Sequence, residues 1–151
     1  MPDLQALYQE EIMDHFRRPR NRGALPSANR WAEGHNPLCG DAVTLALHVE
    51  DDVIRAIRFE GCGCAVSQAA SSMLTEAVEG CTVAQAHALS EAFDAMLKPG
   101  AEPDATALQL GRLAVFSGVA AFPSRVKCAR LPWHTLAAAL AGSDRTVTTE
   151  A

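Results

Sequence analysis

An excess of positive charge and a long apolar run are both missing from this sequence of 151 residues. Lys and Arg number 13 against 18 Asp and Glu, a net charge of −5, which argues against general nucleic-acid binding because such binding draws on summed positive charge. The most apolar stretches, residues 113–122 and 136–141, fall well short of the roughly 18 apolar residues of a membrane span. Since MPDLQALYQEEIMDHF has no charged-then-apolar start, we expect a cytoplasmic protein with no nucleic-acid or membrane partner.

Five cysteines are present, and disulfides are a poor explanation for them. A chain of this length buries roughly two thirds of its unfolded surface and folds as one domain, residues 1–151, without such bridges. The odd cysteine count indicates free or metal-bound thiols in a reducing compartment. No paired CxxC motif is present, so the cysteine spacing alone does not identify a site.

Apolar periodicity and turn residues predict an α+β fold, a small antiparallel β-sheet packed against several helices. Strict alternation predicts two antiparallel strands, residues 43–49 and 53–59, joined at Asp51 and Asp52. Residues 17–40 are rich in Pro and Gly and are predicted as an ordered loop or short extended segment. Helical patterns or capping signals are found over residues 4–16, 65–78, 83–97, 105–121 and 133–140. The last helix is placed after Pro132 because an interior proline kinks a helix, and residues 143–151 are expected to form a flexible tail.

Three cysteines stand where predicted elements end: Cys39 closes the loop, Cys64 opens a helix and Cys128 precedes the last helix. Asp41 follows Cys39 across Gly40, so a tight turn can aim both side chains at one point. Three sulfurs and one oxygen suit zinc, or iron in a sulfide cluster, better than magnesium or calcium.

A fully ionised ligand set carries a charge of −4, so positive charge is expected beside it. Arg125 and Lys127 flank Cys128 and are candidates to supply that charge, although Lys127 could equally face solvent. The arginines at positions 17, 18, 20 and 22 form a basic run that is either a solvated face or a surface that steers docking onto an acidic partner.

The residues alone leave other interpretations open. Buried cysteines often act as small apolar side chains, and we expect this of Cys81. Cys62, Gly63 and Cys64 could form a redox pair, a local metal clip or a protective disulfide, or Cys62 could be a bystander. The five histidines share no spacing that makes a site.

Three cysteine motifs resemble those of the iron–sulfur cluster assembly family of IscU-like or NifU N-terminal proteins. They are NPLCGD (36–41), FEGCGCAVS (59–67) and RVKCA (125–129), and LYQE (7–10), DHF (14–16) and PRNRG (19–23) resemble the same family. The likeness runs from about residue 7 to residue 140. It implies an IscU-like, SufE/NifU-like fold.

Two features resemble the SufU branch of that family. Lys127 stands where IscU-type members have a histidine, and the stretch from Cys64 to Cys128 is longer by about one helix. No Leu-Pro-Pro-Val-Lys chaperone-docking segment is present.

The resemblance to the SufU branch implies a zinc ion held by Cys39, Asp41, Cys64 and Cys128. It also implies sulfur transfer from the persulfide of a SufS-type cysteine desulfurase to downstream iron–sulfur assembly machinery. A desulfurase side chain would replace one zinc ligand during docking. Cys39 is then the expected sulfur acceptor, because it lies on a loop bordered by Gly and Pro, and Arg125 has a supporting role.

Two alternatives remain. The same four residues could instead hold iron, as a scaffold on which a [2Fe–2S] cluster is assembled and handed on. They could also form a structural zinc site in a protein that only binds partners, although closed structural sites are mostly built from Cys and His.

Overall fold

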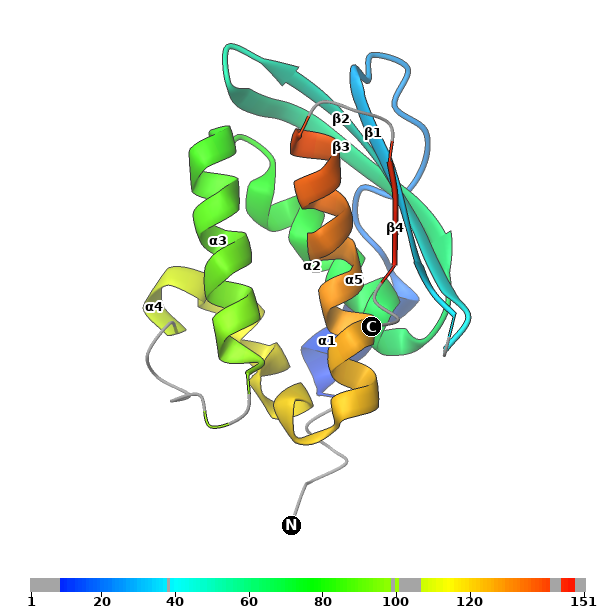
Figure 1. The fold of residues 1–151 in the computed structure, drawn as a ribbon, viewed down its shortest axis with the longest axis vertical. Helices are drawn as coiled ribbons and strands as arrows, with labels where there is room; N and C mark the ends of the chain where they lie inside the picture. Colours follow the sequence, from blue (N-terminus) through cyan, green and yellow to red (C-terminus); the bar gives the residue numbers. More distant parts are fainter. Residues whose placement is uncertain (1–8, 38, 99, 101–106, 142–144, 149–151) are drawn as a thin grey trace.

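The protein was analysed as a computed structural model that describes residues 9–37, 39–98, 100, 107–141 and 145–148. In that part of the chain a twisted sheet forms one layer, and the helices pack together on one side of it (Figure 1). This arrangement confirms the expected α+β class with a small sheet packed against helices.

The sheet is built from a three-stranded antiparallel meander and one added strand. Its order is β3-β2-β1-β4, in which β4 pairs in parallel with β1. Asp51 and Asp52 join the two predicted strands with φ of 54° and 60°, the positive angles of a tight hairpin turn. The strands are β1 (Arg30–Asn36), β2 (Asp41–Glu50), β3 (Val53–Cys62) and β4 (Arg145–Thr148).

Strand β1 lies within the segment for which the sequence predicts an ordered loop or short extended segment. Its buried positions are Ala32, Gly34 and Asn36, so it lacks the run of large apolar residues that marks a strand in sequence. Arg145–Thr148 lie within the range predicted as a tail and form β4, while the rest of that range is outside the described residues.

The helices that follow β3 largely match the expectation. The range of α2 is the predicted one, and α3 begins after Thr82, whose side chain accepts the N–H of Gln85 in a capping box. The helical elements are α1 (Glu10–Arg17), α2 (Ala65–Val78), α3 (Val83–Met96), α4 (Ala107–Leu110), the 3₁₀ helix η2 (Gly111–Ala121) and α5 (Pro123–Leu140).

Two helix predictions were wrong in extent. The helix expected over residues 105–121 is, in its described part, a short α4 followed by a 3₁₀ helix, with a break at Gly111, whose φ is +56°. The last helix begins at Pro123 and contains Pro132 in its interior. Pro132 is buried in a helix that packs on both the sheet and α2, and this packing offsets the lost hydrogen bond.

The core lies between the sheet and the helices, with α5 at its centre. Phe93 of α3 stacks on Trp133 of α5 with ring centroids 5.1 Å apart, and it meets Phe116 of η2 edge-on at 5.6 Å. Such contacts tie three helical elements together. Among the described residues, no helix is long and apolar enough to cross a membrane.

Helix α5 packs directly against β1, and Gly34 allows this close approach. A Cβ added at Gly34 would overlap with Thr135 Oγ1 and would lie 3.0 Å from Leu131 Cδ1. The absence of a side chain at this position therefore sets the distance between the last helix and the first strand.

We expect Gly34→Ala to lower the free energy of unfolding by about 1–3 kcal/mol, because the new methyl group overpacks the β1–α5 contact. Urea denaturation of the variant and the parent measures the change. In a Thr135→Ala background, which removes the hydroxyl that the methyl group meets, the added loss should be smaller. An equal loss in both backgrounds would show that the contact with Thr135 is not the cause.

Candidate metal centre

Cys39, Asp41 and Cys128 form a cluster in which the three potential ligand atoms all lie within 4.8 Å of one another. The sulfur of Cys128 lies 3.4 Å from that of Cys39. Cys128 is fully buried, Asp41 is buried and Cys39 is half-buried. Residues 89 positions apart in the sequence therefore meet at the end of the β1–β2 hairpin.

The hairpin loop presents two of these groups. Asn36 ends β1 and pairs with Asp41, the first residue of β2, and the main-chain oxygen of Asn36 accepts the N–H of Cys39 at 3.2 Å. Gly40 between the two ligand residues has φ of +70°, which glycine adopts without strain. The tight turn predicted from Gly40 is therefore present.

Cys64 joins this cluster through Asp41. Oδ1 of Asp41 accepts the backbone N–H of Cys64 at 2.8 Å, and the Cys64 sulfur lies 3.9 Å from Oδ2. Cys64 is the residue that precedes the first turn of α2, so this carboxylate satisfies a free N–H at the start of that helix. Gly63 has φ of +140°, and a Cβ there would overlap with the Asp41 carboxylate.

The thiols perturb one another strongly. A hydrogen bond with Cys128 lowers the pKa of Cys64 to about 6 although burial opposes the shift. The same bond, together with burial, raises the pKa of Cys128 well above its usual range. A hydrogen bond to Cys128 raises the pKa of Arg125, and the negative charge of the nearby cysteines adds to this effect. The positive charge expected beside the cysteines is therefore supplied by Arg125.

The donor set and its spacing suit a thiophilic metal. Two zinc–sulfur bonds of about 2.3 Å at a tetrahedral angle place the sulfurs about 3.8 Å apart, close to the observed separation of Cys39 and Cys128. Thiolates with one carboxylate favour zinc or an iron–sulfur cluster over magnesium or calcium. Cys64 would complete a fourfold set by turning its sulfur toward the other three groups.

The two other cysteines lie elsewhere. Cys62 is exposed and pairs with Ala42 in the sheet. Ala42 follows the buried Asp41, and successive strand residues point to opposite faces, so the Cys62 side chain projects from the outer face of the sheet. Cys81 is half-buried, and its thiol donates to the main-chain oxygen of Ala77 at 3.3 Å. All five cysteines lie among the described residues, and all are free thiols.

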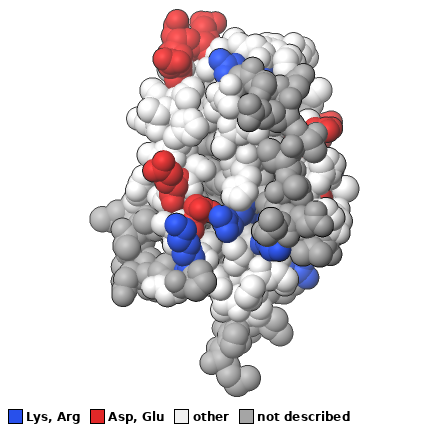
Figure 2. All heavy atoms as spheres, in the orientation of Figure 1, with Lys and Arg blue, Asp and Glu red and all other residues white. Residues whose placement is uncertain are grey.

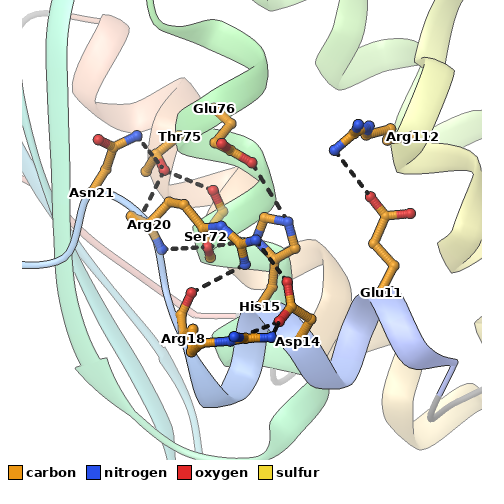
Figure 3. A network of polar contacts seen from close by, with 10 residues as sticks. All are labelled: Glu11, Asp14, His15, Arg18, Arg20, Asn21, Ser72, Thr75, Glu76 and Arg112. Carbon is orange, nitrogen blue, oxygen red and sulfur yellow. Dashed lines mark hydrogen bonds and ion pairs between the residues drawn. The ribbon is translucent and has the colours of Figure 1, made fainter.

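Two residues of the basic run, Arg18 and Arg20, belong to a network of polar contacts around α1 and α2 (Figure 3). Arg18 and Arg20 both form ion pairs with Asp14, and Nη2 of Arg20 lies 2.6 Å from Oδ2 of Asp14. His15 is buried, and its Nδ1 lies 2.7 Å from the Ser72 hydroxyl, which also accepts the backbone N–H of Arg20. These contacts give part of the run a role in holding α1 on α2.

Charge on the surface is mixed in sign. On the face drawn in Figure 2, some of the described Lys and Arg side chains lie next to Asp or Glu side chains and others do not, and an acidic group stands at the top. No single sign of charge covers the described part of this face.

The sequence interpretation missed Asn36 as a site residue. Its side chain is fully buried, and Nδ2 lies 3.7 Å from the sulfur of Cys128. The only signal was its place three residues before Cys39 in NPLCGD, because the contact with Cys128 spans 92 positions.

Comparison with known proteins gives a family and close relatives. Residues 7–129 match the NifU-like N terminal domain. The chain is 38% identical over 134 residues to "Zinc-dependent sulfurtransferase SufU" of Bacillus subtilis (strain 168), covering 89% of each chain. It is 37% identical over 137 residues to "Iron-sulfur cluster assembly scaffold protein IscU" of Streptococcus pyogenes serotype M1, covering 91% of this chain and 84% of that one.

A solved structure shares the fold at similar sequence identity. It is FiSufU, a proposed iron–sulfur cluster assembly scaffold protein for the SUF system of Fervidobacterium islandicum AW-1. The TM-score is 0.83 at 37% identity, over 91% of this chain and 99% of that chain. This match confirms the predicted SufU-like and NifU-like fold.

In the metal-free protein, we expect Cys64 to react with iodoacetamide along a pH profile with its midpoint near 6, because Cys128 stabilises its thiolate. Peptide mass spectrometry follows each cysteine separately. Cys128→Ala removes the largest of the contributions that lower this pKa, while burial and the charge of Asp41 still raise it, so the midpoint should rise by about one unit or more. Identical midpoints in the two proteins would contradict the coupling.

Proposed function

Because the chain belongs to the family of NifU-like N-terminal domains, we propose that it is a zinc-dependent sulfurtransferase for iron–sulfur cluster assembly. It would take sulfur from the persulfide of a cysteine desulfurase of the SufS type. The observation that carries the proposal is the cluster of Cys39, Asp41 and Cys128 with Cys64 beside it, in a chain 38% identical to a relative named a zinc-dependent sulfurtransferase.

Cys39, Asp41, Cys64 and Cys128 are the residues proposed to hold zinc. When bound, zinc would keep the thiols ionised at neutral pH and moderate their reactivity. Arg125 supports the site because its guanidinium lies beside these sulfurs and offsets part of their negative charge. Asp41 supplies the one oxygen ligand, and an oxygen ligand is less suited to a thiophilic metal than sulfur is.

Cys39 is the proposed sulfur acceptor. Its thiolate attacks the outer sulfur of the donor persulfide, a new S–S bond forms on Cys39, and the donor's S–S bond breaks. The bonding electron pair leaves with the donor cysteine as a thiolate, and the transferred sulfur keeps its proton. This exchange needs no outside oxidant or reductant.

The surroundings of the three cysteines favour Cys39 for that role. Cys128 is fully buried within α5, and Cys64 is held at the start of α2 by the Asp41 carboxylate. Cys39 lies in the hairpin loop and is half-buried, so a partner's persulfide reaches it first.

The second candidate function is a scaffold on which a [2Fe–2S] cluster is assembled and passed on. The identity of 37% with the relative named an IscU scaffold supports it, and the same four residues would bind the iron. Lys127 counts against it, because the resemblance to IscU-type scaffolds would imply a histidine at this position.

The proposed partners are a SufS-type desulfurase and the downstream iron–sulfur assembly machinery, and the proposed location is the cytoplasm. Five free thiols agree with a reducing compartment.

We expect the zinc-loaded protein to stimulate cognate cysteine desulfurase, assayed with free cysteine and a reductant, and the metal-stripped protein to stimulate it little. Cys39→Ala should lower sulfur acceptance by at least about tenfold, because the acceptor nucleophile is gone. The matched control is Cys62→Ala, which removes an exposed thiol on the outer face and should leave acceptance unchanged.

Two results would overturn this proposal. Full acceptance by Cys39→Ala with complete loss in Cys64→Ala would move the acceptor role to Cys64. If the desulfurase is not stimulated, and iron with acid-labile sulfide accumulates on the protein during anaerobic reconstitution, the scaffold function replaces sulfur transfer.

A further inference from the structure

Asn36, the last residue of β1, contacts or pairs with three of the residues proposed to hold the metal. Its main-chain oxygen accepts the N–H of Cys39 at 3.2 Å, and it stands opposite Asp41 in the β1–β2 pairing. Its side-chain Nδ2 lies 3.7 Å from the sulfur of Cys128. One residue therefore links the hairpin loop to the last helix at the cluster.

The side-chain contact has a definite direction. An amide nitrogen only donates, so Asn36 gives an N–H to the Cys128 sulfur, and this bond would stabilise negative charge on that sulfur when a metal holds it as a thiolate. Asn36 is 0% exposed, and its Oδ1 has no hydrogen-bond partner among the described residues. A buried amide with an unpaired oxygen is costly, so packing alone would be better served by an apolar side chain.

The two sulfurs of the cluster are held unequally. Cys128 receives an N–H from the Asn36 amide at 3.7 Å, and it lies wholly inside the protein. Cys39 is fixed through its backbone N–H and remains half-buried. A thiolate that accepts N–H bonds is stabilised as an anion and is the weaker nucleophile of two neighbours.

We propose that Asn36 is the positioning residue that keeps Cys128 as the permanent metal ligand and so leaves Cys39 as the sulfur acceptor. The inference rests on the proposed function. It adds which residue gives different roles to two sulfurs that lie only 3.4 Å apart. Without the amide, the Cys128 side chain loses one of the bonds that orient and stabilise its thiolate. Metal binding then weakens, and Cys128 becomes a second acceptor.

The test uses the full chain with Asn36→Leu, which keeps the approximate side-chain volume, and Asn36→Ala, which does not. Zinc affinity is measured by competition with a chromophoric chelator, and the cobalt-substituted proteins are compared by their sulfur-to-metal absorption. Loss of an outer hydrogen bond to a metal ligand weakens binding by about 10–100-fold, and we expect this in both variants. After reaction with desulfurase and cysteine, peptide mass spectrometry should find persulfide on Cys39 alone in the parent and on Cys128 as well in the variants.

The matched control is Thr135→Val. Thr135 is buried on the same face of α5, two turns beyond Cys128, and its hydroxyl donates to the main-chain oxygen of Leu131 at 2.8 Å. The control removes a buried hydrogen bond within α5 without touching a cysteine, so zinc affinity and the cobalt spectrum should match the parent. Unfolding of each metal-free protein is measured alongside, and an affinity loss that merely follows stability would appear in this control too.

The proposal is overturned if the folded Asn36 variants keep the parent's zinc affinity, cobalt spectrum and persulfide position. If only one variant folds, that variant decides, since each lacks the donor. The affinity and cobalt measurements need no desulfurase. A parent protein that takes no sulfur while the variants still lose zinc would therefore contradict the proposed function and leave the role of Asn36 toward Cys128 standing.

Discussion

The close packing of α5 on β1 is the constraint on which the candidate site depends. Gly34 presents no side chain to Thr135 and Leu131, so the helix lies directly against the strand. One turn before Leu131, the same helix carries Cys128 to the end of β1, where the hairpin loop supplies Cys39 and Asp41. A larger residue at position 34 would hold the helix away from the strand, and the sulfur from α5 would no longer meet the loop.

Asp41 joins the second helix to the same point. Its carboxylate accepts the first free N–H of α2 through Cys64, and its other oxygen lies 3.9 Å from the Cys64 sulfur. A carboxylate at a helix N-terminus is stabilised by the helix dipole. One side chain thus caps α2 and contributes a donor atom to the cluster, so the site and the packing of the helices on the sheet are built from the same contacts.

The residues proposed to hold the metal could be predicted from the sequence through their three cysteine motifs and the family resemblance that these motifs carry, and Gly40 beside Cys39 marks a tight turn. Thr82 likewise marks the start of α3, because it is the N-cap residue of that helix. Strand β1 was not predicted as such because Gly34 and Asn36 occupy its buried positions for reasons set by α5, far away in the sequence. The extent of α5 was missed for a similar reason, since burial on two sides outweighs the local penalty of Pro132.

The cluster is asymmetric, and its asymmetry fits exchange better than permanent closure. A buried thiolate needs compensation, and Cys128 receives it from Arg125 and from Asn36. Cys39 is half-buried in the hairpin loop, where Gly40 has φ of +70° and the N–H of Cys39 donates to the main-chain oxygen of Asn36. A purely structural metal site would bury all of its sulfurs and give each of them similar hydrogen bonds. Here one sulfur is fixed from inside the fold and another is left accessible from outside, which is the arrangement that accepting sulfur from a second protein requires.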